Sequence, residues 1–141
     1  MTILFCFLFL AIFLHNYNLK SKTNFNIKKQ PLYIVILIGY TLLALYMTYR
    51  LNNNASGYAL AISSAMVVYS IIFFQGINKE FVLVFLGTSP LLKLVKKEDL
   101  KKISMEEIQD KNEIILKIKA FGDLYTQIYD MDKKDEIKNL Q

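Results

Sequence analysis

Two long apolar runs without a charged residue dominate the first half of the chain. One covers residues 32–49 (LYIVILIGYTLLALYMTY) and the other residues 57–74 (GYALAISSAMVVYSIIFF). At a rise of about 1.5 Å per residue, each predicts a helix of about 27 Å, close to the ~30 Å hydrocarbon core of a bilayer. The short polar link between them makes the two helices an antiparallel hairpin. Pro31 suits the start of the first helix, and Asn54 or Ser56 suits the cap of the second.

A third apolar run at the beginning of the chain is shorter and has two interpretations. Residues 2–15 form either a retained membrane helix, which an extension to Tyr17 would lengthen, or a signal peptide. The run has no basic residues before it and no small-x-small cleavage pattern ahead of Asn16. Both observations favour the retained helix.

The period of the pattern changes after residue 76, where short β-like runs replace the long apolar ones. Residues 113–121 alternate apolar and polar positions, as do residues 124–129, and Gly122-Asp123 between them is typical of a tight hairpin turn. Further strands are expected at 81–86, 91–95 and 100–108. A helix over 98–109 is the alternative to the last of these, because LKKISMEEIQ also tolerates a period of 3.6 residues.

The end of the chain is helix-like. Asp130 or Asp132 is the expected cap, and Ile137 and Leu140 share one face. We therefore predict an α+β membrane protein. Two or three transmembrane helices (about 2–15, 32–49 and 57–74, within residues 1–75) precede a small antiparallel sheet of about five strands with a closing helix, in residues 76–141.

The charges divide at the same boundary. Residues 1–75 hold five of the 17 basic residues and no acidic residue, whereas residues 76–141 hold the other twelve basic and all twelve acidic residues. The net charge of +5 therefore lies beside the helices, and the second half is neutral. A neutral soluble part argues against nucleic acid as a partner.

This distribution predicts the orientation of the chain in a cell membrane. The segment between the first two helices carries four lysines and no acid, whereas the link between the second and third carries only Arg50. Basic loops stay on the cytoplasmic side. The C-terminal domain of this multi-pass protein is then cytoplasmic, and the N-terminus lies outside if the first segment spans the membrane.

The order of the segments resembles one known type of protein. The segments GINKEFVLVF, LLKLVKKEDLKKISME, NEIILKIKAFGDLYTQIYD and EIKNL follow the membrane helices in that order. In hydrophobic rhythm they resemble the small bacterial multi-pass membrane proteins with a C-terminal pleckstrin-homology-like (PH-like) domain, an uncharacterised type. The resemblance implies a PH-like fold for residues 76–141 and no particular activity.

The residues offer no recognisable reaction centre. The chain has no HExxH, CxxC, GxSxG or glycine-rich phosphate motif. Cys6 is expected to be a small buried apolar residue, His15 an interfacial one, and Asp130, Asp132 and Asp135 helix-start acids rather than cation ligands. We expect no enzyme activity, no cofactor and no metal.

Two groups of residues are candidates for binding. Lysines close in sequence to the membrane either contact lipid headgroups or form an ordinary solvated strand face: Lys93, Lys96, Lys97, Lys101 and Lys102. Small residues four positions apart on the last membrane helix either pack against a helix of the same chain or mediate self-association: Gly57, Ala61 and Ala65.

Two functions follow as hypotheses. In the first, the cytoplasmic tail is a non-enzymatic interaction module that offers a strand edge or sheet face to a protein partner. In the second, the chain is an accessory subunit of a membrane transport or envelope-stress/immunity complex and acts through its helices. The lipid bilayer is the one partner common to both.

Overall fold

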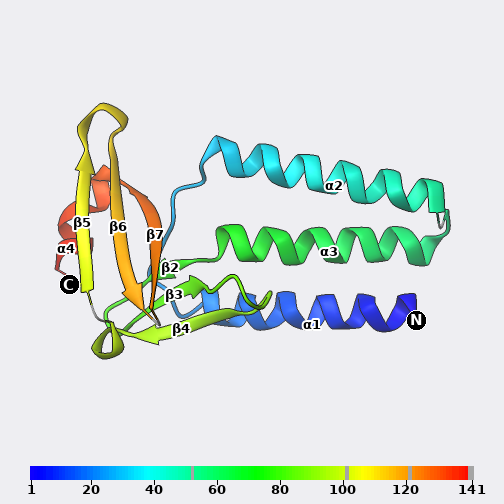
Figure 1. The fold of residues 1–141 in the computed structure, drawn as a ribbon, viewed down its shortest axis with the longest axis horizontal. Helices are drawn as coiled ribbons and strands as arrows, with labels where there is room; N and C mark the ends of the chain where they lie inside the picture. Colours follow the sequence, from blue (N-terminus) through cyan, green and yellow to red (C-terminus); the bar gives the residue numbers. More distant parts are fainter. Residues whose placement is uncertain (52, 101, 121, 140–141) are drawn as a thin grey trace.

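Three long helices lie side by side at one end of the molecule, and two β-sheets lie at the other (Figure 1). The computed structural model describes residues 1–51, 53–100, 102–120 and 122–139. The helices are α1 (Thr2–Lys20), α2 (Pro31–Leu51) and α3 (Ala55–Phe73). In the described residues these three are long and apolar enough to cross a membrane. α1 and α3 run toward the sheets and α2 runs away from them, so the N-terminus and the α2–α3 link share the far end.

The helix boundaries have local causes. α2 begins at Pro31, as predicted. Asn54 caps α3, because its Oδ1 accepts a hydrogen bond from the Gly57 N–H at 2.9 Å. α1 continues to Lys20, well past the predicted end at His15, so that its 19 residues reach about 28 Å. At this length the first segment is long enough to cross a membrane.

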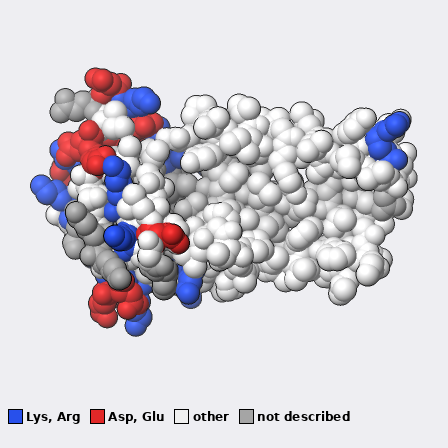
Figure 2. Space-filling model, viewed as in Figure 1, with Lys and Arg blue, Asp and Glu red and all other residues white. Residues whose placement is uncertain are grey.

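The helical part carries almost no charge. Figure 2 shows an uncharged surface between the charged sheets and a basic group at the far end, where Arg50 lies in the last turn of α2. α3 is the central helix and packs against both of the others. By contrast, none of residues 31–51 of α2 is buried.

The strands form two antiparallel sheets rather than the predicted single sheet of about five. The four-stranded sheet has the order β1-β2-β3-β4, and the three-stranded sheet the order β5-β6-β7. Their bounds are β1 Phe25–Asn26, β2 Gly76–Ile77, β3 Phe81–Phe85, β4 Leu92–Lys96, β5 Lys102–Ile108, β6 Glu113–Ala120 and β7 Asp123–Asp130.

β1 and β2 were not predicted, and β1 belongs to the loop between α1 and α2. Phe25 pairs with Ile77, and Gly76 pairs with Leu83 of β3. The glycine is required at this point, since a Cβ on Gly76 would overlap the carbonyl oxygen of Phe25. The inter-helix loop is thus part of the sheet.

The hairpin predictions are confirmed and the alternative helix over residues 98–109 is wrong. Residues 102–108 form β5, which pairs along its whole length with β6. A single 3₁₀ turn at Lys97–Asp99 precedes it. Gly122 has a φ of 94°, the left-handed conformation that the predicted β6–β7 turn needs.

The main core lies between the two sheets and the final helix α4 (Lys134–Lys138). The alternation predicted for β6 is confirmed, because Ile114, Leu116, Ile118 and Ala120 are buried. Ile137 of α4 is fully buried, as expected, while Leu140 lies outside the described residues. Asp130, one of the two predicted caps, occupies the N-cap of a 3₁₀ turn at Met131–Lys133 that leads directly into α4, but its side chain makes no cap hydrogen bond and pairs with Lys28 instead. Lys133 occupies the N-cap of α4 itself.

Candidate functional site

The helices and the sheets meet at a junction formed by segments that are far apart in sequence. The last turns of α1 and α3, the loop that carries β1, the β3–β4 turn and strand β7 all contribute (Figure 1). Three sets of contacts hold this junction together, and a crevice lies beside them.

Asn16 makes the first set of contacts. Its Nδ2 donates to Ser70 Oγ of α3 at 2.8 Å and to the carbonyl oxygen of Pro90 at 3.0 Å. Its Oδ1 accepts from the N–H of Leu92, the first residue of β4, at 2.9 Å. The side chains of Asn16 and Ser70 are fully buried. One amide therefore joins two apolar helices to the β3–β4 hairpin with all its bonds satisfied.

Aromatic rings make the second set. Phe74, which directly follows α3, packs against Phe13 and Tyr17 of α1 and against Tyr69, with ring centroids 5.5 to 6.0 Å apart. Lys20 Nζ lies 4.7 Å from the Phe74 ring centroid, a cation–π distance. Phe74, Leu83 and Leu92 form a second small core between helices and sheet.

Lys28 makes the third set, between the loop and β7. Its N–H donates to the carbonyl oxygen of Ile128 at 2.6 Å, and its Nζ lies 3.1 Å from Asp130 Oδ1 and 3.4 Å from Glu113 Oε1. The hydrogen bond with Asp130 is the main cause that raises the pKa of Lys28. Asp130 is thus an ion-pair partner.

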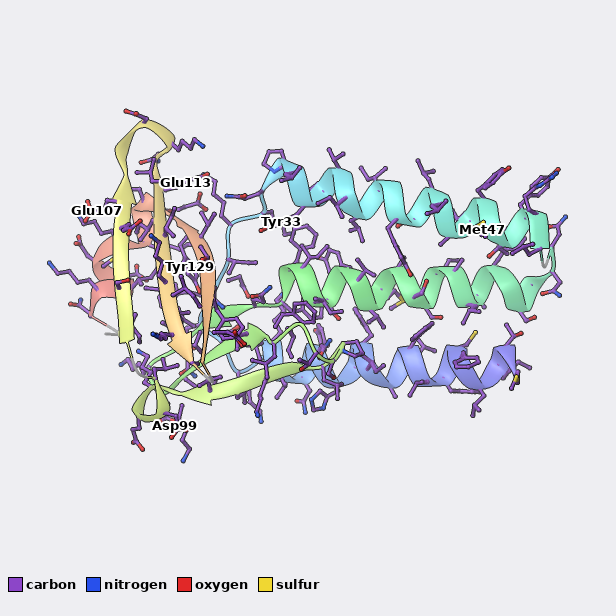
Figure 3. The ribbon with its side chains drawn as sticks, in the orientation of Figure 1. Tyr33, Met47, Asp99, Glu107, Glu113 and Tyr129 are labelled. Atoms are coloured by element: carbon purple, nitrogen blue, oxygen red, sulfur yellow. The ribbon has the colours of Figure 1, made fainter. Side chains whose placement is uncertain are left out.

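The junction crevice lies between the beginning of α2, the end of α3 and strands β3 and β7, with a volume of about 230 Å³. Its lining is mainly apolar and also includes polar side chains, among them Lys28, Thr126 and Gln127. Figure 3 shows Tyr33 at the sheet end of α2, where its side chain lines this space, whereas Met47 lies near the opposite end of the helix. Six of its lining residues are Gln30, Tyr33, Ile71, Ile72, Gln75 and Phe85.

The structure separates the predicted lysine group. β4 starts beside α1 and runs away from the helices, so exposed Lys93 lies nearer the helices than exposed Lys96, the last residue of the strand (Figure 1). Lys101 lies outside the described residues, and Lys102 opens β5. Headgroup contact by these lysines stays a prediction.

Lys97 differs from its neighbours. Its Nζ is buried and has no hydrogen-bond partner among the described residues. Burial lowers the pKa of the Lys97 ammonium. The side chain borders a hollow of about 480 Å³ together with Lys79, Glu80 and Lys96. The turn that contains Asp99 stands away from the helices in Figure 3.

The small residues of α3 take different positions. Gly57 and Ala61 are buried, and Ala65 is half-buried. Thr48 of α2 donates to the carbonyl oxygen of Gly57 at 3.4 Å, so this part of α3 contacts α2. Self-association through the same residues stays a prediction.

Several other polar residues lie in different surroundings. His15 is exposed, Cys6 is half-buried, and the described ranges hold no group of three metal-ligating side chains. Gln127 is buried, with its Nε2 donating to the Leu83 carbonyl oxygen at 2.8 Å and its Oε1 accepting from the Tyr129 hydroxyl at 2.6 Å. The first bond connects the two sheets, the second lies within β7, and together they satisfy this buried polar pair.

Searches of protein-family models, curated proteins and solved structures found no match to this chain. The fold alone defines its class, namely three apolar helices of membrane-spanning length attached to a two-sheet antiparallel β domain with a short final helix.

Proposed function

We propose that the chain is a multi-pass membrane protein whose sheet domain lies in the cytoplasm and acts as a non-enzymatic interaction module. The basic α1–α2 loop at the sheet end, against Arg50 alone at the other end, supports this orientation. A PH-like fold for residues 76–141, which the resemblance implies, is part of the same proposal.

The unpaired outer edge of β5 is the observation that carries the proposal. β5 is an outer strand of its sheet and pairs with β6 on one side. It lies on the side of the domain farthest from the helices, whereas β7 lies nearest to them (Figure 1). A strand edge with unpaired N–H and C=O groups is a template for an added strand. The junction contacts keep this edge pointed away from the membrane.

The test uses Glu106→Pro and Glu107→Pro in the full chain. Neighbouring N–H groups on a strand point to opposite sides, so one proline removes a bond to β6 and the other removes only an outward N–H. The proline variant that loses only the outward N–H should retain the wild-type unfolding temperature. Glu106→Gln and Glu107→Gln control for the ion pairs with Lys117 and Lys134.

A photo-crosslinking residue at Ile108 then reports partner contact in intact cells. We expect a discrete protein adduct from the wild type and from both glutamine controls, and a loss of at least tenfold in the folded proline variant. Equal adducts from wild type and that variant would contradict recognition through the β5 edge.

An accessory-subunit function is the second candidate, and the unburied surface of α2 favours it. A helix that buries none of its apolar residues within the chain is available to another membrane protein as well as to lipid. Crosslinkers at Leu42 and Leu43 of α2 test it, since both are exposed. Adducts from α2 and none from β5 would assign the partner contact to the helices.

A further inference from the structure

The junction crevice has two chemically different parts. Ile71 and Ile72 from the end of α3 and Phe85 from the end of β3 form apolar walls. Gln30 directly before α2, Tyr33 in its first turn and Gln75 beyond α3 are polar lining residues that we call the polar edge, and Lys28, Thr126 and Gln127 line the crevice as well. An apolar cleft with a few polar groups at one end suits an amphipathic ligand.

The position of the crevice selects the kind of amphipathic ligand. It lies where two membrane-length helices end, which is the level of the lipid headgroups when those helices span. α2, one of its walls, has no buried residue over 31–51 and therefore contacts lipid along its length. A lipid beside α2 has direct access to the crevice.

The polar edge presents neutral hydrogen-bond donors, whereas the Lys28 ammonium, which also lines the crevice, is paired with Asp130 and Glu113. The Tyr33 hydroxyl and the Gln30 side-chain amide have no hydrogen-bond partner among the described residues, and no Asp or Glu lines the crevice. Lys29 is next to Gln30 in sequence, and its Nζ lies 6.0 Å from the Phe73 ring centroid. Hydroxyl, amide and ammonium donors together suit the oxygens of a phosphate.

We infer that the junction crevice binds one phospholipid from the leaflet on the sheet side. Part of an acyl chain lies against Ile72 and Phe85, and the phosphate accepts hydrogen bonds from Tyr33 and Gln30. A volume of about 230 Å³ holds several times the ~30 Å³ share of one water, so it takes a chain segment while the rest of the lipid lies along α2. The inference rests on the membrane location proposed above but is independent of β5.

The experiment uses the full chain in mild detergent, after confirming that it is extracted from the membrane fraction. Delipidated protein is incubated with phosphatidylglycerol and examined by native mass spectrometry. Ile72→Trp fills the crevice, and Leu42→Trp places the same ring on the exposed face of α2 as a control. Tyr33→Phe removes only the hydroxyl, with Tyr40→Phe as its control.

We expect one retained phosphatidylglycerol per wild-type chain, at least a tenfold loss in Ile72→Trp and a loss of about three- to tenfold in Tyr33→Phe. Both controls should equal the wild type. Diacylglycerol with the same acyl chains should be retained at least tenfold less.

Two results would overturn the inference. Equal retention in Tyr33→Phe, Ile72→Trp and the controls would exclude the crevice, and equal retention of diacylglycerol would exclude phosphate recognition. Tyr33→Phe keeps the test decisive if the tryptophan variant fails to fold. A chain absent from the membrane fraction would instead contradict the membrane location, before any lipid is measured.

Discussion

The side-chain amide of Asn16 in α1 lies 2.8 Å from the hydroxyl of Ser70 in α3, and both residues are completely buried. The Ser70 hydroxyl in turn donates to the carbonyl oxygen of Val67 at 2.7 Å. Polar contacts between apolar helices fix their relative position, because a buried polar group that loses its partner costs free energy. Here the same amide also binds the β3–β4 hairpin, so helix packing and domain placement depend on one residue.

Replacement of Asn16 by leucine should therefore destabilise the whole protein. Asn16→Leu keeps a similar volume but leaves the Leu92 N–H and the Pro90 carbonyl without their partner. We expect a loss of about 1–3 kcal/mol in the free energy of unfolding for each buried group left unpaired. Thermal unfolding in detergent measures the loss.

Asn18→Leu is the matched control, since Asn18 is exposed on the same helix. It should unfold at the wild-type temperature. Ser70→Ala should cost less than Asn16→Leu, because the Asn16 amide still donates to Pro90, and the double variant should be less than additive. Strict additivity would contradict a shared bond.

The parts of the fold with local signals were predictable from the sequence. Alternation at Ile114–Ala120 predicts a half-buried strand whatever lies beside it, and Gly122 predicts the turn. Residues 98–109 remained ambiguous because their helical and strand patterns are equally good locally. Pairing of Met105 with Leu116 on β6 decides for the strand, and that is a tertiary contact.

The junction could not be predicted either, because it too is formed by tertiary contacts. β1 has two residues, too few for any periodicity, and exists because Ile77 returns to Phe25. In the sequence, Asn16 is only the polar end of an apolar run. Its role depends on the N–H of Leu92, 76 residues later, which the β3–β4 hairpin brings against it. One signal was available, since polar Asn16 and Ser70 inside apolar helices indicate an interhelical hydrogen bond.

The close approach at Gly76 gives a second prediction. Gly76→Ala places a Cβ against the Phe25 carbonyl, a backbone atom that cannot rotate away. We expect the β1–β2 pair to break, with a loss of about 1–3 kcal/mol. Limited trypsin digestion at Lys22 and Lys28 should become faster as the loop leaves the sheet.

Gly39→Ala provides the control for this substitution. Gly39 lies within α2, and a Cβ there meets nothing within 4 Å. The variant should match the wild type in both unfolding temperature and trypsin sensitivity. Unchanged digestion in Gly76→Ala would show that β1 does not hold the loop.

The buried ammonium of Lys97 gives a third prediction. Its pKa is lowered by burial, so the folded state binds this proton less tightly than the unfolded state. Below the folded-state pKa the charge therefore opposes folding, and this penalty disappears as the pH rises toward the unfolded-state pKa near 10.5.

Lys97→Met should raise the unfolding temperature by a few degrees at pH 7, with a smaller gain above pH 10. Exposed Lys96→Met should change it little, and a Lys97→Met variant less stable at pH 7 would contradict the argument.

The hydroxyl of Tyr129 gives a prediction of opposite sign at alkaline pH. Tyr129 is fully buried, and burial raises the pKa of its hydroxyl above the ordinary value of 10.0. The folded state keeps this proton when the unfolded state loses it, so stability is lost as the pH rises above about 10. At pH 7, Tyr129→Phe should cost about 1–3 kcal/mol because Gln127 Oε1 loses its donor. Above pH 10 the difference in the free energy of unfolding between wild type and variant should narrow by about 1.4 kcal/mol per pH unit.

Urea unfolding between pH 7 and 11 measures this difference, with Tyr125→Phe on the same strand as the control. Partial burial and the Asp123 carboxylate also raise the pKa of the half-buried Tyr125, so the difference for Tyr125→Phe should narrow as well, but less. A constant difference for Tyr129→Phe across this range would mean that its hydroxyl ionises equally in the folded and unfolded chain.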